Sequence, residues 1–201
     1  MGSPVAELLV PVKPMQRVEV GYGLVCIRGV LSAAECETLI ARAESVGFEP
    51  ATINTRSGAQ RDERARDNDR VILDDIELAS DLWTRVADHV PVIRAGRQVI
   101  GLNERLRFYR YHPGQRFDWH EDAPFRRGNG EMSLLTFMIY LNEGYRDGAT
   151  AFHNASDIAG ERGMALLFEH GLMHRGDEVT EGVKYALRSD VMYGPVGRIS
   201  G

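Results

Sequence analysis

The C-terminal half of the chain is a succession of short strand-like segments separated by glycine-rich turns. Strands of this length, joined by turns instead of helices, are typical of a closed or sandwiched antiparallel sheet. We therefore expect a mainly β fold from residue 97 onward. The predicted strands cover about residues 104–111, 132–142, 149–153, 163–169 and 184–193.

The N-terminal half predicts one strand and two helices. The strand covers Gly23 to Val30. A capping box at Ser32-Ala33-Ala34-Glu35 predicts the start of a helix that Gly47 ends. A second helix is expected from about Asp75 to His89, because apolar residues recur there at helical spacing. Its predicted apolar face contains Ile76, Leu78, Ala79, Leu82, Trp83 and Val86. Both helices are expected to pack outside a sheet.

A chain of 201 residues is long enough for one well-packed domain and short for two. Three prolines within residues 1–16 predict an irregular N-terminal lead-in. Residues 17–201 are then expected to form a single domain, with helical support over about 32–90 and the β part over about 97–195.

Composition excludes several classes of protein. The formal net charge of -5 gives no broad positive field for a phosphate backbone, so dedicated nucleic-acid binding is not expected. No apolar run approaches the length that spans a bilayer, and the N-terminus lacks the pattern of a secretory signal. The two cysteines, Cys26 and Cys36, lack metal-binding spacing, which predicts free thiols and a cytoplasmic protein.

His120 and Asp122 form a His-x-Asp pair in an extended segment. Residues two apart in such a segment project to the same face, so the pair can direct an imidazole and a carboxylate at one point. Two histidines and one carboxylate leave other metal positions open, as in non-haem Fe(II) enzymes that activate oxygen. Asp122 neutralises one of the two metal charges, which favours a chelating keto acid as co-substrate.

The second histidine of the site has several candidates. We favour His174, which follows the apolar run Met164 to Phe168 and precedes a second run, Val183 to Tyr193. A hairpin of these two runs would bring His174 and Lys184 to the same end of a barrel. His170 is the alternative ligand. The remaining histidines are His89, which we expect at a helix C-terminus, His112 and His153.

Lys184 begins an alternation on one strand face that continues with Ala186, Arg188 and Asp190. An ammonium directed into the barrel needs an anion. The site hypothesis supplies the distal carboxylate of the keto acid, and the structural alternatives are Asp190 and Asp177. Arg188 is the second candidate for the anchor, because a guanidinium binds a carboxylate through two hydrogen bonds.

The run from Leu106 to Asp122, with His174 and Lys184 downstream, resembles the prolyl 4-hydroxylase branch of the Fe(II)/2-oxoglutarate-dependent dioxygenases. The resemblance covers about residues 103–193 and is loose before that. It implies a double-stranded β-helix, or jelly roll, braced by the two helices. It also implies Fe(II) held by His120, Asp122 and His174, with 2-oxoglutarate as co-substrate and ascorbate as a further cofactor candidate.

The same resemblance implies that Lys184 binds the distal carboxylate of 2-oxoglutarate. Tyr111 and Tyr140 match the co-substrate tyrosines of the family, and Thr150 matches less well. Taken alone, each tyrosine is better explained by packing in a core. Phe117 and Trp119 are candidates for the wall of the site.

The predicted activity is hydroxylation of an unactivated carbon with release of succinate and carbon dioxide. Oxygen and a small-molecule or peptidyl substrate are the expected partners. The family usually has two glycines, a glutamate and a threonine where this chain has Asp147-Gly148-Ala149-Thr150, so a prolyl substrate does not follow from the match. Two alternatives are a cupin-like metalloenzyme of other chemistry and a non-catalytic jelly-roll binding module.

Residues 54–70 contain mixed charges and hardly any large apolar side chain. Such a composition predicts a solvated loop. The alternative is a lid that orders over the substrate and excludes water.

Overall fold

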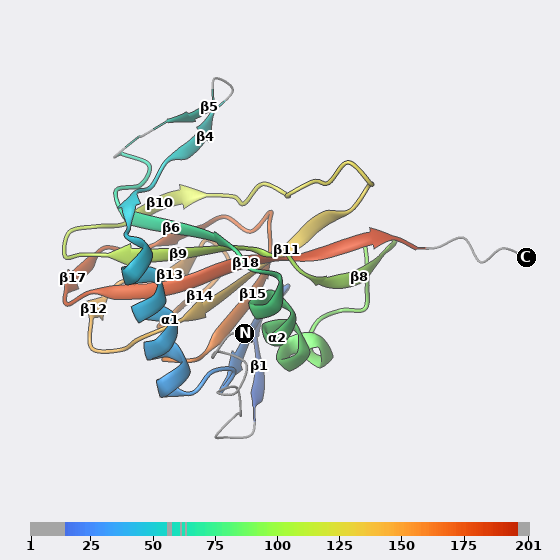
Figure 1. The fold of residues 1–201 in the computed structure, drawn as a ribbon, viewed down its shortest axis with the longest axis horizontal. Coiled ribbons are helices and arrows are strands. Elements are labelled where there is room, and N and C mark those ends of the chain that lie inside the picture. The colour runs from blue at the N-terminus through green and yellow to red at the C-terminus, as the bar shows by residue number, and fades with distance from the viewer. Residues whose placement is uncertain (1–14, 56–57, 61, 63, 197–201) are drawn as a thin grey trace, which may run out of the picture.

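Two antiparallel sheets face each other, and two helices cover the outer face of the larger sheet (Figure 1). The computed structural model describes residues 15–55, 58–60, 62 and 64–196. The C-terminal strands supply most of both sheets, which confirms the predicted sandwiched antiparallel architecture with flanking helices.

The larger sheet places its strands in an order that differs from the order in the chain. From one edge to the other, the sheet contains β1 (Gln16–Gly21), β2 (Leu24–Arg28), β15 (Ala165–Glu169), β11 (Met132–Tyr140), β18 (Lys184–Pro195), β9 (Arg105–Tyr111), β6 (Asp69–Asp74) and β3 (Glu49–Pro50). The far end of β18 also pairs with β8 (Arg97–Leu102), which pairs with β7 (Ile93–Arg94). The long strand β18 therefore lies in the centre of the sheet.

The smaller sheet has four short strands. In order, they are β10 (Phe117–His120), β16 (His174–Gly176), β13 (Thr150–Phe152) and β14 (Ala155–Ile158). Two further ribbons are formed by β12 (Arg146–Asp147) with β17 (Val179–Glu181), and by β4 (Ile53–Thr55) with β5 (Gly58–Gln60). The ribbon of β4 and β5 projects from the body of the molecule (Figure 1).

Both helices begin where the sequence predicts. The capping box of α1 (Ala33–Val46) is formed, since Ser32 Oγ accepts from Glu35 N–H at 3.3 Å and Glu35 Oε2 accepts from Ser32 N–H at 2.6 Å. Asp75 caps α2 (Ile76–Val86), which continues into the short 3-10 helix η1 (Ala87–His89). Ile76 does not belong to the apolar face as predicted, because this first helical residue is 77% exposed.

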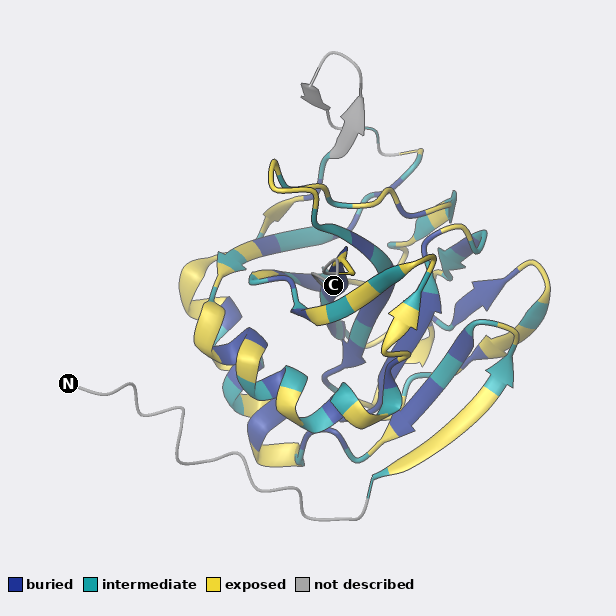
Figure 2. Ribbon diagram, turned by 90° about the vertical axis from the view of Figure 1, so that its right-hand side faces the viewer, coloured by how far each residue is buried: buried dark blue, intermediate teal, exposed yellow. Residues whose placement is uncertain are grey.

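Successive residues of the central strands serve opposite faces of the larger sheet. In β18, Leu187 and Val191 belong to the core beneath the helices, whereas Lys184 and Arg188 line a pocket between the sheets. Buried segments follow these strands through the molecule (Figure 2). The predicted alternation of β18 is confirmed, and it separates an apolar core from a polar interior.

The predicted hairpin of the runs 164–168 and 183–193 is wrong. The strands β15 and β18 lie on opposite sides of β11 and do not pair with each other. Between them the chain crosses to the smaller sheet and forms β16, which begins at His174. The polar connection is thus a strand of the second sheet, a pairing that local sequence does not specify.

The prediction of a solvated loop for residues 54–70 is wrong at its C-terminal end. Asp69 and Arg70 begin β6, and both Arg66 and Asn68 are buried. Arg66 is covered because it pairs with Phe117 in an isolated bridge and places its guanidinium over the Phe117 ring. Residues 56–57, 61 and 63 of this segment, and residues 1–14 of the predicted lead-in, lie outside the described residues.

Neither helix of the described chain has the length and apolar character needed to cross a membrane.

Cys26 and Cys36 are buried and free, as predicted from their spacing.

Candidate functional site

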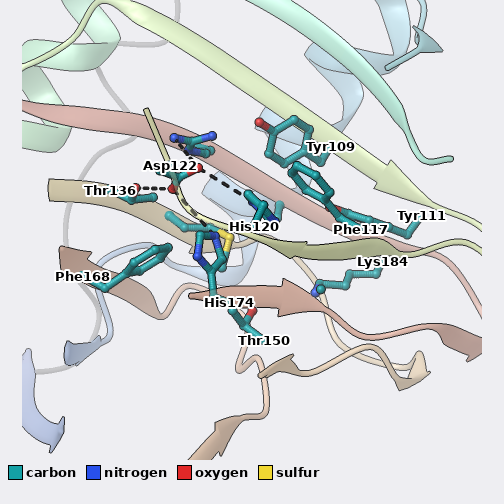
Figure 3. Close-up of a pocket in the computed structure, with 14 residues that line it drawn as sticks. Tyr109, Tyr111, Phe117, His120, Asp122, Thr136, Thr150, Phe168, His174 and Lys184 are labelled. Atoms are coloured by element: carbon teal, nitrogen blue, oxygen red, sulfur yellow. Dashed lines mark hydrogen bonds and ion pairs between the residues drawn. The ribbon is translucent and has the colours of Figure 1, made fainter. Parts of the chain in front are cut away.

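His120, Asp122 and His174 meet in the pocket between the two sheets (Figure 3). One ligand atom from each residue lies within 4.8 Å of those of the other two. His120 ends β10 and His174 begins β16, and these two residues are direct partners in the pairing of the strands. The predicted triad is therefore assembled by the smaller sheet, with Asp122 two residues beyond His120.

Hydrogen bonds orient both imidazoles in the same way. His120 Nδ1 donates to the carbonyl oxygen of Asp118 at 2.7 Å, and His174 Nδ1 donates to that of Leu172 at 2.8 Å. The two Nε2 atoms face Asp122, each 3.7 Å from one of its carboxylate oxygens. A histidine that donates from one ring nitrogen keeps the lone pair of the other for a metal.

The protonation states suit a metal site. Burial and the neighbouring His174 lower the pKa of His120 to about 4, and burial lowers the pKa of His174 as well. Burial raises the pKa of Asp122, but the positive charge of Arg188, the neighbouring histidines and the Thr136 hydrogen bond together bring it down to about 2. Two neutral imidazoles and one carboxylate are thus ready to bind a cation at neutral pH.

Asp122 is held by three neighbours. Arg188 Nη2 lies 3.0 Å from Oδ1, and the Thr136 hydroxyl donates to Oδ2. The backbone N–H of Asp122 donates to the carbonyl oxygen of His170 at 2.9 Å. Thr136 was missed by the sequence analysis. Its position in the sequence could have indicated it: Thr136 lies two positions from Met138 and four from the candidate residue Tyr140, and therefore on the same face of β11.

His170 lies behind the triad and not within it. Its Nδ1 is 3.0 Å from the Thr136 hydroxyl, and its Nε2 is 2.7 Å from the Ser133 hydroxyl. Both ring nitrogens are therefore engaged, and His170 contacts Asp122 through Thr136 and through its own backbone. His89 ends the short helix η1, and His153 packs 4.1 Å from the Trp119 ring.

Lys184 enters the same pocket from β18 and is only 3% exposed. Its Nζ donates to the carbonyl oxygen of Gly148 at 2.6 Å. The rings of Tyr111 and Tyr140 lie 5.3 and 5.4 Å from Nζ. No carboxylate among the described residues forms an ion pair with it: Asp177 pairs with Arg175, and Asp190 pairs with arginines.

The two family tyrosines and Thr150 lie around Lys184. Tyr111 and Thr150 line the pocket, and the Thr150 hydroxyl is 2.7 Å from that of Tyr140. Figure 3 shows Thr150 and Lys184 together, away from Asp122. Burial lowers the pKa of Lys184 to about 8, with Asp177 opposing that shift. The pocket therefore contains a cation site at one end and a buried ammonium at the other.

Arg188 occupies the metal end of the pocket. Its guanidinium lies between Asp122 and Asp190, at 3.0 and 3.2 Å. The structure thus separates the two candidate anchors: Arg188 contacts two carboxylates of the protein, whereas Lys184 contacts none of the described ones. Phe117 stacks on His120, with ring centroids 3.6 Å apart, and forms a wall of the pocket.

The donor set fits Fe(II). Two imidazole nitrogens and one carboxylate face the same point, and the pocket beyond them is lined by Lys184 and Thr150 instead of further ligands. A facial arrangement of this kind leaves metal positions for a chelating co-substrate and oxygen.

Comparison with known proteins agrees with this chemistry. The profile of the 2OG-Fe(II) oxygenase superfamily matches residues 106–189, a span that contains the triad and Lys184. The matched span is similar to the 2OG-Fe(II) oxygenase superfamily over somewhat less than half of the chain. The predicted 2-oxoglutarate-dependent dioxygenase is confirmed at this level. No curated protein sequence matches the chain.

Solved structures of prolyl hydroxylases have the same fold as this oxygenase. The viral collagen prolyl hydroxylase of Paramecium Bursaria Chlorella virus-1, as its 2OG complex, is 20% identical with a TM-score of 0.62, over 87% of this chain and 97% of that one. A Pseudomonas putida prolyl-4-hydroxylase is 18% identical with a TM-score of 0.63, over 84% and 92% of the two chains.

A third similar structure is a prolyl hydroxylase from Trichoplax adhaerens in complex with a hypoxia inducible factor oxygen degradation domain peptide fragment. It is 16% identical with a TM-score of 0.67, over 86% of this chain and 84% of that one. These likenesses confirm the predicted jelly-roll fold of the prolyl 4-hydroxylase type.

Proposed function

We propose that the protein hydroxylates an unactivated carbon of its substrate, with His120, Asp122 and His174 holding Fe(II) and Lys184 binding 2-oxoglutarate. In the overall reaction, oxygen, 2-oxoglutarate and a C–H bond give succinate, carbon dioxide and an alcohol. The proposal rests on the match of residues 106–189 to the profile of the 2OG-Fe(II) oxygenase superfamily and on the arrangement of these four side chains.

The observation that carries the proposal is the buried ammonium of Lys184. A buried charge without an opposite charge is unfavourable unless a ligand supplies one. Lys184 donates to a backbone carbonyl and forms no ion pair with a described carboxylate, yet it lines the same pocket as the triad. A diacid with one end at the metal would bring its other carboxylate to this ammonium.

Each side chain of the pocket has a distinct part in this proposal. The bound Fe(II) supplies the activation of oxygen and the oxidation of the C–H bond. Lys184 would pair with the distal carboxylate, and the hydroxyl groups of Thr150 and Tyr111, which line the same pocket, would donate hydrogen bonds to it. Arg188 and Thr136 hold the Asp122 carboxylate ionised and fixed toward the metal. Phe117 and Phe168 keep water from the co-substrate.

A prolyl residue is the first substrate that we would test. One of the similar structures is named a collagen prolyl hydroxylase, and another is a prolyl hydroxylase in complex with a peptide fragment. The changed motif before Thr150 is a reason to screen free amino acids and other small metabolites beside it. Ascorbate is proposed as the reductant that keeps the iron ferrous between turnovers.

Anaerobic addition of Fe(II) and 2-oxoglutarate tests the proposal. The chelated keto acid should give a weak visible metal-to-ligand absorption band, and His174→Ala should remove it. Arg17→Gln is the matched control, because Arg17 is an exposed residue of β1 at the edge of the larger sheet. Absence of the band in the wild-type protein would contradict the proposal and favour a metal site of other chemistry or a binding module.

A further inference from the structure

A second hollow adjoins the pocket on the metal side. Its empty volume is about 1340 Å³, against about 450 Å³ for the pocket of Lys184, in both cases including open solvent at the mouth. The two share five lining residues: Tyr109, Phe117, His120, Asp122 and Arg188. A substrate lying in this groove would therefore reach the proposed iron from the side opposite the distal end of 2-oxoglutarate.

Arg66 is a buried cation of this groove that no described carboxylate neutralises. It is 4% exposed, and its Nε and Nη2 both donate to Asn68 Oδ1, at 3.1 and 2.9 Å. The guanidinium carbon lies 4.1 Å from the centroid of the Phe117 ring and 4.9 Å from that of Tyr109. Asn68 accepts from two of the five N–H groups of the guanidinium, so further N–H groups remain for an anion.

Arg70 is a second cation of the groove, partly buried and without a described carboxylate partner. Among the described residues its hydrogen bonds go to Thr52: Nη1 lies 3.4 Å from the backbone oxygen and Nη2 lies 3.0 Å from Oγ1. Arg70 is the strand partner of Tyr109, the residue against which Arg66 packs. Burial lowers the pKa of Arg70, and the positive charges of Arg66, Arg107 and Arg188 lower it further.

The acidic residues of the groove have other partners or lie apart from these two arginines. Asp190 pairs with Arg107 at 3.2 Å and with Arg188, and Asp122 pairs with Arg188. Asp62 accepts from backbone N–H groups, and Asp118 accepts from that of Trp119. Glu121, the remaining acidic residue of the lining, is exposed and forms no ion pair with a described residue.

The stack of rings beside the metal fixes where such an anion would lie. The Phe117 ring lies between the Arg66 guanidinium on one side and the His120 imidazole on the other. An anionic group bound at Arg66 and Arg70 would thus lie on the groove side of the Phe117 ring, separated from the proposed iron ligand by that ring and the Arg66 guanidinium. Carbon atoms a few bonds from that group would then be in reach of the metal.

We propose that the substrate is anionic and that its carboxylate or phosphate binds Arg66 and Arg70 in this groove. This inference rests on the proposed hydroxylase function, whose substrate it restricts. An arginine binds such oxyanions through parallel, charge-assisted hydrogen bonds, which amides cannot replace. Neutral prolyl peptides are therefore expected to be poor substrates unless an acidic side chain or a free C-terminus lies near the reacting residue.

Calorimetric titration with matched acids and amides tests the proposal in the metal-free protein loaded with 2-oxoglutarate. The probes are N-acetyl-L-proline, N-acetyl-prolyl-glycine and their C-terminal amides, with inorganic phosphate as a separate arm. Each acid is expected to bind at least about tenfold more tightly than its amide, or phosphate to bind instead. The double variant R66Q/R70Q should abolish that preference, and R17Q should retain it.

Because Arg66 is buried, R70Q is also titrated alone, and R70K should restore part of the preference. The anion site would be overturned if the wild-type protein bound acid and amide equally and did not bind phosphate. It would also be overturned if the preference for the acid, or the binding of phosphate, survived in folded R66Q/R70Q. The visible band with Fe(II) and 2-oxoglutarate is recorded on the wild-type protein in parallel. Loss of that band contradicts the hydroxylase function, whereas a retained band without anion binding contradicts only the substrate class.

Discussion

The Nζ atom of Lys184 lies 2.6 Å from the carbonyl oxygen of Gly148, a residue with φ of 67°. A Cβ atom at position 148 would lie 2.9 Å from Val179 Cγ2, so the close approach of this backbone depends on glycine. One neutral acceptor therefore holds a buried ammonium in a pocket. The motif that departs from the family pattern thus still contributes to the proposed co-substrate site.

Lys184→Met should weaken binding of 2-oxoglutarate by about 2–5 kcal/mol, because it removes one partner of a buried charge pair. Calorimetric titration with 2-oxoglutarate in the Mn(II)-loaded protein gives the affinity. Metal binding should persist, since Lys184 lies at the other end of the pocket from the triad. Arg188→Ala is the comparison: a larger loss of 2-oxoglutarate affinity there than in Lys184→Met would assign the anchor to Arg188.

Affinity for 2-oxoglutarate should fall at alkaline pH. Burial lowers the pKa of Lys184 to about 8. The free protein therefore has a charged lysine below that pH and a neutral amine above it. A neutral amine cannot pair with the distal carboxylate, so the dissociation constant should rise by up to about tenfold per pH unit above pH 8. Lys184→Met should show a flat profile, and an equally steep profile in that variant would place the titrating group elsewhere.

His174→Ala and Asp122→Ala should each abolish succinate formation, since each removes a proposed ligand. His170→Asn should retain iron, because the ring of His170 contacts the Ser133 and Thr136 hydroxyls and lies outside the triad. Metal content and succinate release can be measured on the same samples. Full turnover in His174→Ala would promote His170 to a ligand.

Thr136→Val should lower Fe(II) affinity about 10- to 100-fold, the usual effect of losing a hydrogen bond to a metal ligand. Valine keeps the volume of threonine but cannot donate to Asp122 Oδ2. Thr136→Ser keeps the hydroxyl and should retain most of the affinity. Competition with a fluorescent chelator measures both variants. Equal affinities of the two would show that the hydroxyl does not orient Asp122.

Most residues of the candidate site could be predicted because their positions follow local rules of sequence. The positions of His120 and Asp122 along one extended segment and of Lys184 and Arg188 along another follow from the two-residue period of strands. His174 was chosen from a hairpin that does not exist. It nevertheless reaches the pocket, because β16 pairs with β10 and makes His174 the strand partner of His120.

The parts that sequence could not predict depend on pairing between distant segments. Arg66 lies in a polar stretch that predicts exposure, yet it is buried by Phe117 and Tyr109, which come more than forty positions later in the chain. Charge composition describes a segment alone and contains no information about the aromatic rings that will cover it. The groove residues were missed for this reason, while the triad was found.

The strand β18 is hydrogen-bonded to β9 on one side and to β11 on the other, and it carries both Lys184 and Arg188. In the proposed function, the position of Lys184 on this central strand would set the distance between the metal and the second carboxylate of the co-substrate. Diacids one carbon shorter or longer, oxaloacetate and 2-oxoadipate, would then bind less well than 2-oxoglutarate.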